Sequence, residues 1–141
     1  MKSIPTCLIA AVLAMASAPS LAGVVMVVSA NSETTSLSKE DAAALYLGKT
    51  TALPGGGSAK LYDLPDSNPA RERFYQAVAG KSASQVKAVW SRLVFSGRVL
   101  PPHEAANDAA VIKAVASDPH AVGYVDSGAV DASVKAVLKL P

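Results

Sequence analysis

Hydrophobic positions along the chain form one uninterrupted valine-rich run, followed by several stretches with helical spacing. The run GVVMVVSAN at 23–31 is typical of a strand that is buried on both faces, as in a parallel sheet covered by helices. After it, Ser38 and Asp41 resemble a capping box with aspartate in place of glutamate, and Gly48 ends the predicted helix. The apolar face of this helix comprises Ala42, Leu45 and Tyr46.

The segment DLPDSNPARERFYQAV, which begins at Asp63, leads from a predicted strand into a predicted helix. The strand covers 60–64, with the sequence KLYDL. Asn68 can cap the helix, and a proline occupies its first position, where the missing N–H of proline has no cost. We expect the helix to cover 69–79 and to end at Gly80. Its inward-facing residues are Phe74, Tyr75 and Val78.

The remaining patterns predict two more helices and two more strands. A helix over 82–97 has apolar residues at spacings of three and four, and a helix over 107–119 has a shorter apolar face. Strands at 121–126 and 133–140 complete the chain. The predicted order β-α-β-α-α-α-β-β indicates an α/β fold in one domain, with helices covering a short sheet. The inward residues of these helices are Val86, Val89, Trp90, Leu93 and Val94, then Val111, Ile112 and Val115.

The first residues have the pattern of a secretory signal peptide. A basic residue precedes the apolar run 7–15, and Ser20-Leu21-Ala22 fits the small-x-small pattern of a cleavage site. The site at 16–18 also fits, but a proline would follow the cut. An uncleaved membrane anchor is the alternative, although the run is shorter than the roughly 20 residues that a span needs. We therefore predict a signal peptide at 1–22 and a mature domain at 23–141, outside the cytoplasm.

The composition argues against several classes of partner. The net charge is only +2 and no basic stripe has interleaved aromatics, so nothing indicates nucleic acid. A zinc site needs three or four ligands, but the mature chain has no cysteine and its two histidines, His103 and His120, are far apart. We therefore expect no metal and no cofactor.

Catalytic motifs are also missing from the sequence. There is no Gly-x-Ser-x-Gly elbow and no nucleophile with a nearby base, so we expect no enzyme. The glycine-rich PGGGSAK at 54–60 lacks the Gly-Lys-Ser/Thr order of a Walker loop and leads to a strand, which is typical of a plain loop. Asp63 and Asp66 could do acid–base work if burial separated their pKa values. We expect instead that they face solvent or cap a helix.

Ser67, Asn68 and Arg71 form the strongest candidate site, at the start of the helix over 69–79. A helix N-terminus offers unpaired N–H groups and a partial positive charge, and it readily binds phosphate or sulfate. The Ser67 hydroxyl and the Asn68 amide can donate hydrogen bonds, and Arg71 could reach back to hold two oxygens. The alternative is a plain cap, with Asn68 closing the helix and Arg71 solvated. The residues alone leave both interpretations open.

Four segments follow one another along the chain: LSKEDAAALYLGK, LPDSNPARERFYQAVAG, VWSRLVFSG and AVGYVD. In this order they resemble the phosphate ABC transporter substrate-binding proteins, most closely the short, single-lobe members. The resemblance covers nearly the whole mature chain. It implies a single lobe of the periplasmic-binding-protein-like (type II) fold, with a short mixed sheet covered by helices. It also implies a periplasmic solute-binding protein for phosphate or a similar oxyanion, with an ABC permease as a partner.

The binding site of that family corresponds only in part to this sequence. In full-length members phosphate lies between two α/β lobes, and a Ser-Gly-Thr turn at a helix start is followed by a phenylalanine. The resemblance places Ser67 at the serine and Phe74 at the phenylalanine, whereas Asn68 and Pro69 replace glycine and threonine. The mature chain has room for about one lobe, so a homodimer or another envelope protein would have to supply the second wall. The alternative is an interaction or structural protein of the envelope that keeps the fold and binds no ligand.

Overall fold

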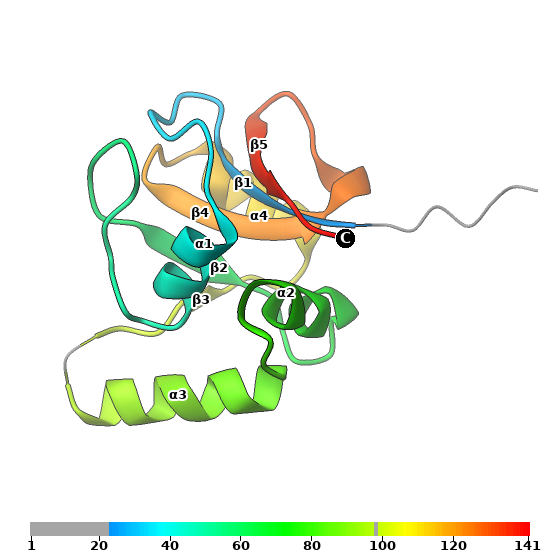
Figure 1. Ribbon diagram of the computed structural model, residues 1–141. Coiled ribbons are helices and arrows are strands. Elements are labelled where there is room, and N and C mark those ends of the chain that lie inside the picture. Colours follow the sequence, from blue (N-terminus) through cyan, green and yellow to red (C-terminus); the bar gives the residue numbers. More distant parts are fainter. Residues whose placement is uncertain (1–22, 98) are drawn as a thin grey trace, which may run out of the picture.

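The computed structural model describes residues 23–97 and 99–141, which are built on a five-stranded sheet with the strand order β3-β2-β4-β1-β5 (Figure 1). The strands are β1 (Val24–Ser29), β2 (Lys60–Asp63), β3 (His103–Glu104), β4 (Ala121–Asp126) and β5 (Val134–Lys139). The helices are α1 (Lys39–Tyr46), α2 (Pro69–Ala79), α3 (Ala83–Phe95), α4 (Asp108–Ala116) and the short 3-10 helix η1 (Ser127–Ala129). The predicted signal peptide at 1–22 lies outside the described residues.

The sheet is mixed, because β2 runs parallel to β3 and β4 while β1 runs antiparallel to β4 and β5. All six residues of β1 are buried, which confirms the predicted burial on both faces. The expectation that this run resembles a strand of a parallel sheet is wrong, because both neighbours of β1 are antiparallel to it. A continuous apolar run indicates that both faces are covered, and it carries no information on the direction of the neighbouring strands.

Helices cover both faces of the sheet, as two successive residues of β4 demonstrate. Neighbouring residues of a strand point to opposite faces. At Gly123 the missing side chain leaves room for Val111 and Val115 of α4, whereas Tyr124 stacks on Phe74 of α2 with ring centroids 4.0 Å apart. The two helices therefore lie on opposite faces, and α1 packs beside α2 (Figure 1).

Capping residues confirm the predicted start of α1 and both predicted ends of α2, whereas α4 ends at Ala116, before the predicted 119. Ser38 and Asp41 form the expected capping box at α1. The Asn68 side chain accepts a hydrogen bond from the N–H of Ala70 at the start of α2. Gly80 ends α2 with a φ of 63°, a left-handed conformation that glycine adopts without strain. Local signals thus predict the bounds of α2 correctly.

The helix α3 lies where it is predicted, but its apolar face is only partly covered. Val86 and Trp90 are buried, whereas Val94 is 42% exposed and the last residue, Phe95, is 95% exposed. The spacing of apolar residues predicts a face, but it cannot say how much of that face other elements cover. The strand β3 is missing from the predicted elements, because its two exposed residues carry no periodic pattern.

Residues 23–97 and 99–141 contain no candidate membrane span and no candidate metal cluster. None of the helices there is long and apolar enough to cross a bilayer. No three His, Cys, Asp or Glu side chains in residues 23–97 and 99–141 are grouped so that they could hold a metal ion.

Candidate functional site

The three parallel strands end at the same edge of the sheet, and α2 begins there. β2 ends at Asp63, β3 at Glu104 and β4 at Asp126. The turn from β2 into α2 carries the predicted site residues Ser67 and Asn68. Ligands of open α/β sheets bind beyond the carboxyl ends of the strands. This edge is therefore the place where the fold favours a binding site.

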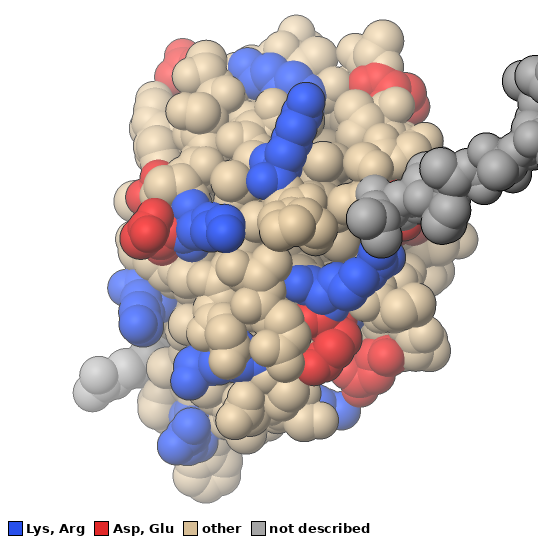
Figure 2. All heavy atoms as spheres, turned by 45° about the vertical axis from the view of Figure 1, so that its right-hand side comes forward, with Lys and Arg blue, Asp and Glu red and all other residues tan. Residues whose placement is uncertain are grey.

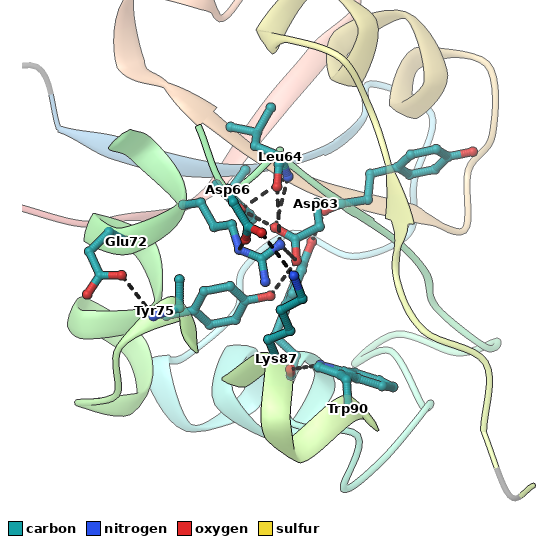
Figure 3. Close-up of polar contacts among 12 residues, drawn as sticks. Asp63, Leu64, Asp66, Glu72, Tyr75, Lys87 and Trp90 are labelled. Atoms are coloured by element: carbon teal, nitrogen blue, oxygen red, sulfur yellow. Dashed lines mark hydrogen bonds and ion pairs between the residues drawn. The ribbon is translucent and has the colours of Figure 1, made fainter. Parts of the chain in front are cut away.

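Asp63 is the centre of a buried hydrogen-bond network at this edge (Figure 3). Its carboxylate accepts hydrogen bonds from the Tyr75 hydroxyl at 2.6 Å, the Leu64 N–H at 2.8 Å and Arg71 Nη1 at 3.2 Å. The Tyr124 hydroxyl donates a further, short hydrogen bond to Asp63 Oδ1. Four donors thus compensate for the cost of removing this charge from water.

The expectation that Asp63 faces solvent or caps a helix is wrong, since the residue is 5% exposed. In contrast, the side chain of Asp66 is 61% exposed. As the last residue of β2, Asp63 points to the face of the sheet that carries Tyr124 and α2. The sequence does not reveal this network, because its donors Tyr75 and Tyr124 lie 12 and 61 positions from Asp63, on other elements. The alternation in KLYD, which puts Leu61 and Asp63 on one face, was the available signal.

A cluster of aromatic rings surrounds the carboxylate. Tyr46 packs edge-on against Phe74 at 4.8 Å between centroids, and its hydroxyl donates to the Tyr62 carbonyl at 2.8 Å. Burial, followed by the negative charge of Asp63, raises the pKa of Tyr46, Tyr75 and Tyr124 well above the ordinary value. The hydroxyls of Tyr75 and Tyr124 therefore stay protonated at neutral pH, where they act as donors to Asp63.

Arg71 is held against this network from the first turn of α2. Its Nη1 donates to Asp63 and to the Leu64 carbonyl, both at 3.2 Å, and its side chain is only 12% exposed. Its Nε lies 3.3 Å from Asp66 Oδ1, close enough for an ion pair but without the direction of a hydrogen bond. Burial alone lowers the pKa of Arg71, but the neighbouring acidic groups, above all the carboxylate of Asp63, outweigh it and raise the pKa.

A second, exposed ion pair extends the network to α3. Lys87 Nζ donates to Asp66 Oδ2 at 3.2 Å, and Figure 3 shows the Lys87 side chain reaching toward the carboxylates. The hydrogen bond from Lys87, together with the charges of Arg71 and Lys87, lowers the pKa of Asp66. Asp66 therefore lies between two cations, the fixed guanidinium of Arg71 and the exposed ammonium of Lys87.

The three predicted site residues lie around the start of α2, but they are not equally available. Ser67 is exposed in the turn. The Asn68 side-chain oxygen is used in the cap, its N–H donates to the Pro65 carbonyl, and its carbonyl accepts from the Arg71 N–H. The Arg71 guanidinium reaches back toward the turn as expected, where it meets carboxylates.

A solvent-open cavity of about 490 Å³ lies beside Arg71 and has two different ends. Ser67 and Asn68 are not among the described residues that line it. Figure 2 shows that cations and carboxylates are interspersed over one side of the molecule, with no extended field of one sign. The charged end of the cavity is formed by Asp63, Asp66, Arg71, Lys87 and Glu104. The apolar end is formed by Trp90, Val94, Phe95, Pro101 and Pro102.

Comparisons with known proteins give matches among solved structures only. No protein-family model matches the chain, and no curated protein sequence matches it. A protein from Clostridium perfringens, described as a phosphate ABC transporter substrate-binding protein and solved with bound phosphate, superposes with a TM-score of 0.65 at 18% identity. An ABC-type phosphate transport receptor from Vibrio cholerae superposes with a TM-score of 0.59 at 20% identity.

The two superpositions cover most of this chain but less than half of the other proteins. Each includes 82% of this chain, and they include 44% of the Clostridium perfringens protein and 45% of the Vibrio cholerae receptor. The expected fold class, a mixed sheet covered by helices in one lobe of a periplasmic-binding-protein-like fold, is thereby confirmed. At this level of identity the likeness establishes the fold. The chain therefore has the fold of the phosphate ABC transporter substrate-binding proteins, over a little less than half of their length.

Proposed function

We propose that the protein is a periplasmic solute-binding protein that binds phosphate or a similar oxyanion beside Arg71, with Ser67 and Asn68 as further contacts. The observation that supports this most is a fixed guanidinium at the edge of the sheet where ligands of such folds bind. The fold likeness to two proteins described as phosphate transport proteins adds to it. An ABC permease is the partner that follows from this proposal.

Arg71 has donors to spare for a ligand. Its Nη1 and Nε face Asp63, Leu64 and Asp66, while its Nη2 has no hydrogen-bond partner in the described part of the chain. A guanidinium that is already ordered loses little side-chain entropy on binding, which favours affinity. Lys87, whose side chain is 68% exposed, adds a second positive charge to the same cavity.

The carboxylates at the charged end limit the affinity. Asp63, Asp66 and Glu104 bring three negative charges against the two positive charges of Arg71 and Lys87. The cavity is also open to water, where a charge-assisted hydrogen bond contributes less than in an enclosed cleft. We therefore expect a monomer to bind phosphate with a dissociation constant of about 1 mM.

Calorimetric titration tests this proposal. The purified protein is titrated with phosphate and then with sulfate at low ionic strength, because salt screens exposed charges. We expect saturable heat with phosphate, reduced in Ser67→Ala and Lys87→Ala and lost in Arg71→Ala. Circular dichroism confirms that each variant is folded, and Lys113→Ala on α4 serves as a matched control. No heat at millimolar phosphate, or equal affinity in the double variant Ser67→Ala with Arg71→Ala, would contradict the proposal.

One observation favours the second candidate function, an interaction protein of the envelope that binds no ligand. The apolar end of the cavity includes Phe95, which is almost fully exposed. Large exposed apolar groups on a small domain mark interaction surfaces. A pull-down from periplasmic extract that recovers no partner would count against this candidate.

A further inference from the structure

The C-terminal end of α3 exposes three large hydrophobic residues. Phe95 is 95% exposed, Leu100 is 86% exposed and Val94 is 42% exposed. Single exposed hydrophobic residues are normal, but a contiguous group on a small domain marks an interaction site. Figure 1 shows that this end of α3 lies at the periphery of the molecule, so the group is accessible to a partner.

These residues line two neighbouring cavities, whose shared apolar residues form one surface between them. The cavity of about 490 Å³ includes Val94 and Phe95, and a second cavity of about 400 Å³ includes Leu100. Trp90 and two prolines line both cavities. We call this surface the α3 patch, and it consists of Trp90, Val94, Phe95, Leu100, Pro101 and Pro102.

Charges of both signs border the α3 patch. Lys87 and Arg92 are exposed on α3, where Lys87 lines the first cavity and Arg92 lies about one helical turn before Phe95. Asp66 and Glu104 are exposed at the start of α2 and in β3, and both line the first cavity. An occupant that combines an apolar side chain with a neighbouring cation would match the hollow and its carboxylates. The end of α3 is itself such a segment, because Arg92 and Phe95 are three residues apart on one helix.

We propose that the α3 patch is the interface of a homodimer of this chain. Phe95 of one copy enters the hollow beside Trp90 of the second copy, and Arg92 faces Glu104 of that copy. A two-fold interface uses the same surface on both subunits, so it must be complementary to itself. The α3 patch and its border meet this condition, since the patch contains both the protruding aromatic ring and the hollow, and its border carries both the cation and the carboxylate.

The size of the α3 patch predicts a weak dimer. Two phenylalanine side chains remove roughly 300–500 Å² from water, against about 1,600 Å² in a standard interface. The flank of α3, about 20 Å long for a helix of 13 residues, must supply much of the rest. Interfaces at the small end of the range are transient. We therefore expect dissociation in the micromolar range.

The dimer would also enclose the cavity beside Arg71, which connects it with the proposed function. The test nevertheless needs no ligand, so a monomeric protein and a protein that binds no phosphate are separate results. Sedimentation equilibrium of the purified protein is measured from low micromolar to submillimolar concentration without phosphate. We expect the average mass to rise toward twice the monomer mass and to level off there.

Two sets of variants identify the surface. Phe95→Ser should weaken dimerisation at least about tenfold, as expected for an aromatic residue at the centre of an interface. Arg92→Glu should weaken it too, and Arg92→Glu combined with Glu104→Arg should restore it. Lys139→Ser, on the distant β5, is the matched control. A monomer at every concentration, mass that continues to rise beyond a dimer, or a dimer unaffected by Phe95→Ser would overturn the proposal.

Discussion

The two ends of the cavity beside Arg71 differ in whether their side chains have contacts within the chain. At the charged end, Asp63 is buried and receives four hydrogen bonds from within the chain. At the apolar end, Phe95 is 95% exposed and contributes almost no burial to the fold. The charged end therefore holds the domain together, whereas the apolar end is available to something outside it. The same cavity wall combines residues that stabilise the fold with residues that are free for association.

The largest effect should follow from removing the centre of the charged end. Asp63→Ala removes the acceptor of two buried tyrosine hydroxyls and the buried ion-pair partner of Arg71, and we expect a loss of about 3–5 kcal/mol in the free energy of unfolding. Urea denaturation monitored by circular dichroism measures it. Asp66→Ala, at the exposed neighbour, is the control and should change stability little. Equal effects of the two variants would remove the distinction between buried and exposed carboxylates.

A smaller loss of stability is expected when a single hydrogen-bond donor to Asp63 is removed. Tyr75→Phe and Tyr124→Phe each delete one hydrogen bond to Asp63, which should cost about 1–3 kcal/mol in the same denaturation experiment. Tyr62→Phe is the matched control, because Tyr62 is only half-buried and points to the face of β2 opposite to Asp63. If Tyr62→Phe destabilised the protein as much as Tyr75→Phe or Tyr124→Phe, the lost hydrogen bonds to Asp63 would not explain the destabilisation.

Alkaline pH should weaken the same network gradually. The pKa values of Tyr46, Tyr75 and Tyr124 are raised in the fold, chiefly by burial, so the unfolded chain loses these protons first. Their contribution is complete below the unfolded pKa of about 10 and is lost as the pH rises above it. We expect stability to fall by up to about 1.4 kcal/mol per pH unit for each tyrosine. Denaturation midpoints at pH 8 to 11 should fall less steeply in Tyr75→Phe with Tyr124→Phe, and an identical slope would refute this account.

The smallest effect on stability belongs to the apolar end. Phe95→Ser should change the free energy of unfolding by no more than about 0.5 kcal/mol, because the side chain is already in water. Denaturation at a concentration where the protein is monomeric measures this change. A loss comparable to that in Tyr75→Phe would mean that Phe95 is buried in solution and that the two ends do not differ.

Local signals in the sequence predicted more of this molecule than long-range ones. The bounds of α2 follow from Asn68 and Gly80, whose effects on the backbone do not depend on the rest of the fold. The role of Asp63 could not be predicted in this way, because its donor Tyr124 lies 61 positions away. The exposure of Phe95 could not be predicted either. An apolar face has the same spacing whether another element covers it or not.

The central claim is that Arg71 presents a fixed guanidinium to an oxyanion at the start of α2. The most direct test is a crystal structure of the protein grown in saturating phosphate. We predict density for phosphate in contact with Arg71 Nη2 and the Ser67 hydroxyl, with the bond from Arg71 to Asp63 retained. A well-ordered structure in which Arg71 contacts only Asp63, Leu64 and Asp66, with no phosphate beside it, would contradict the claim.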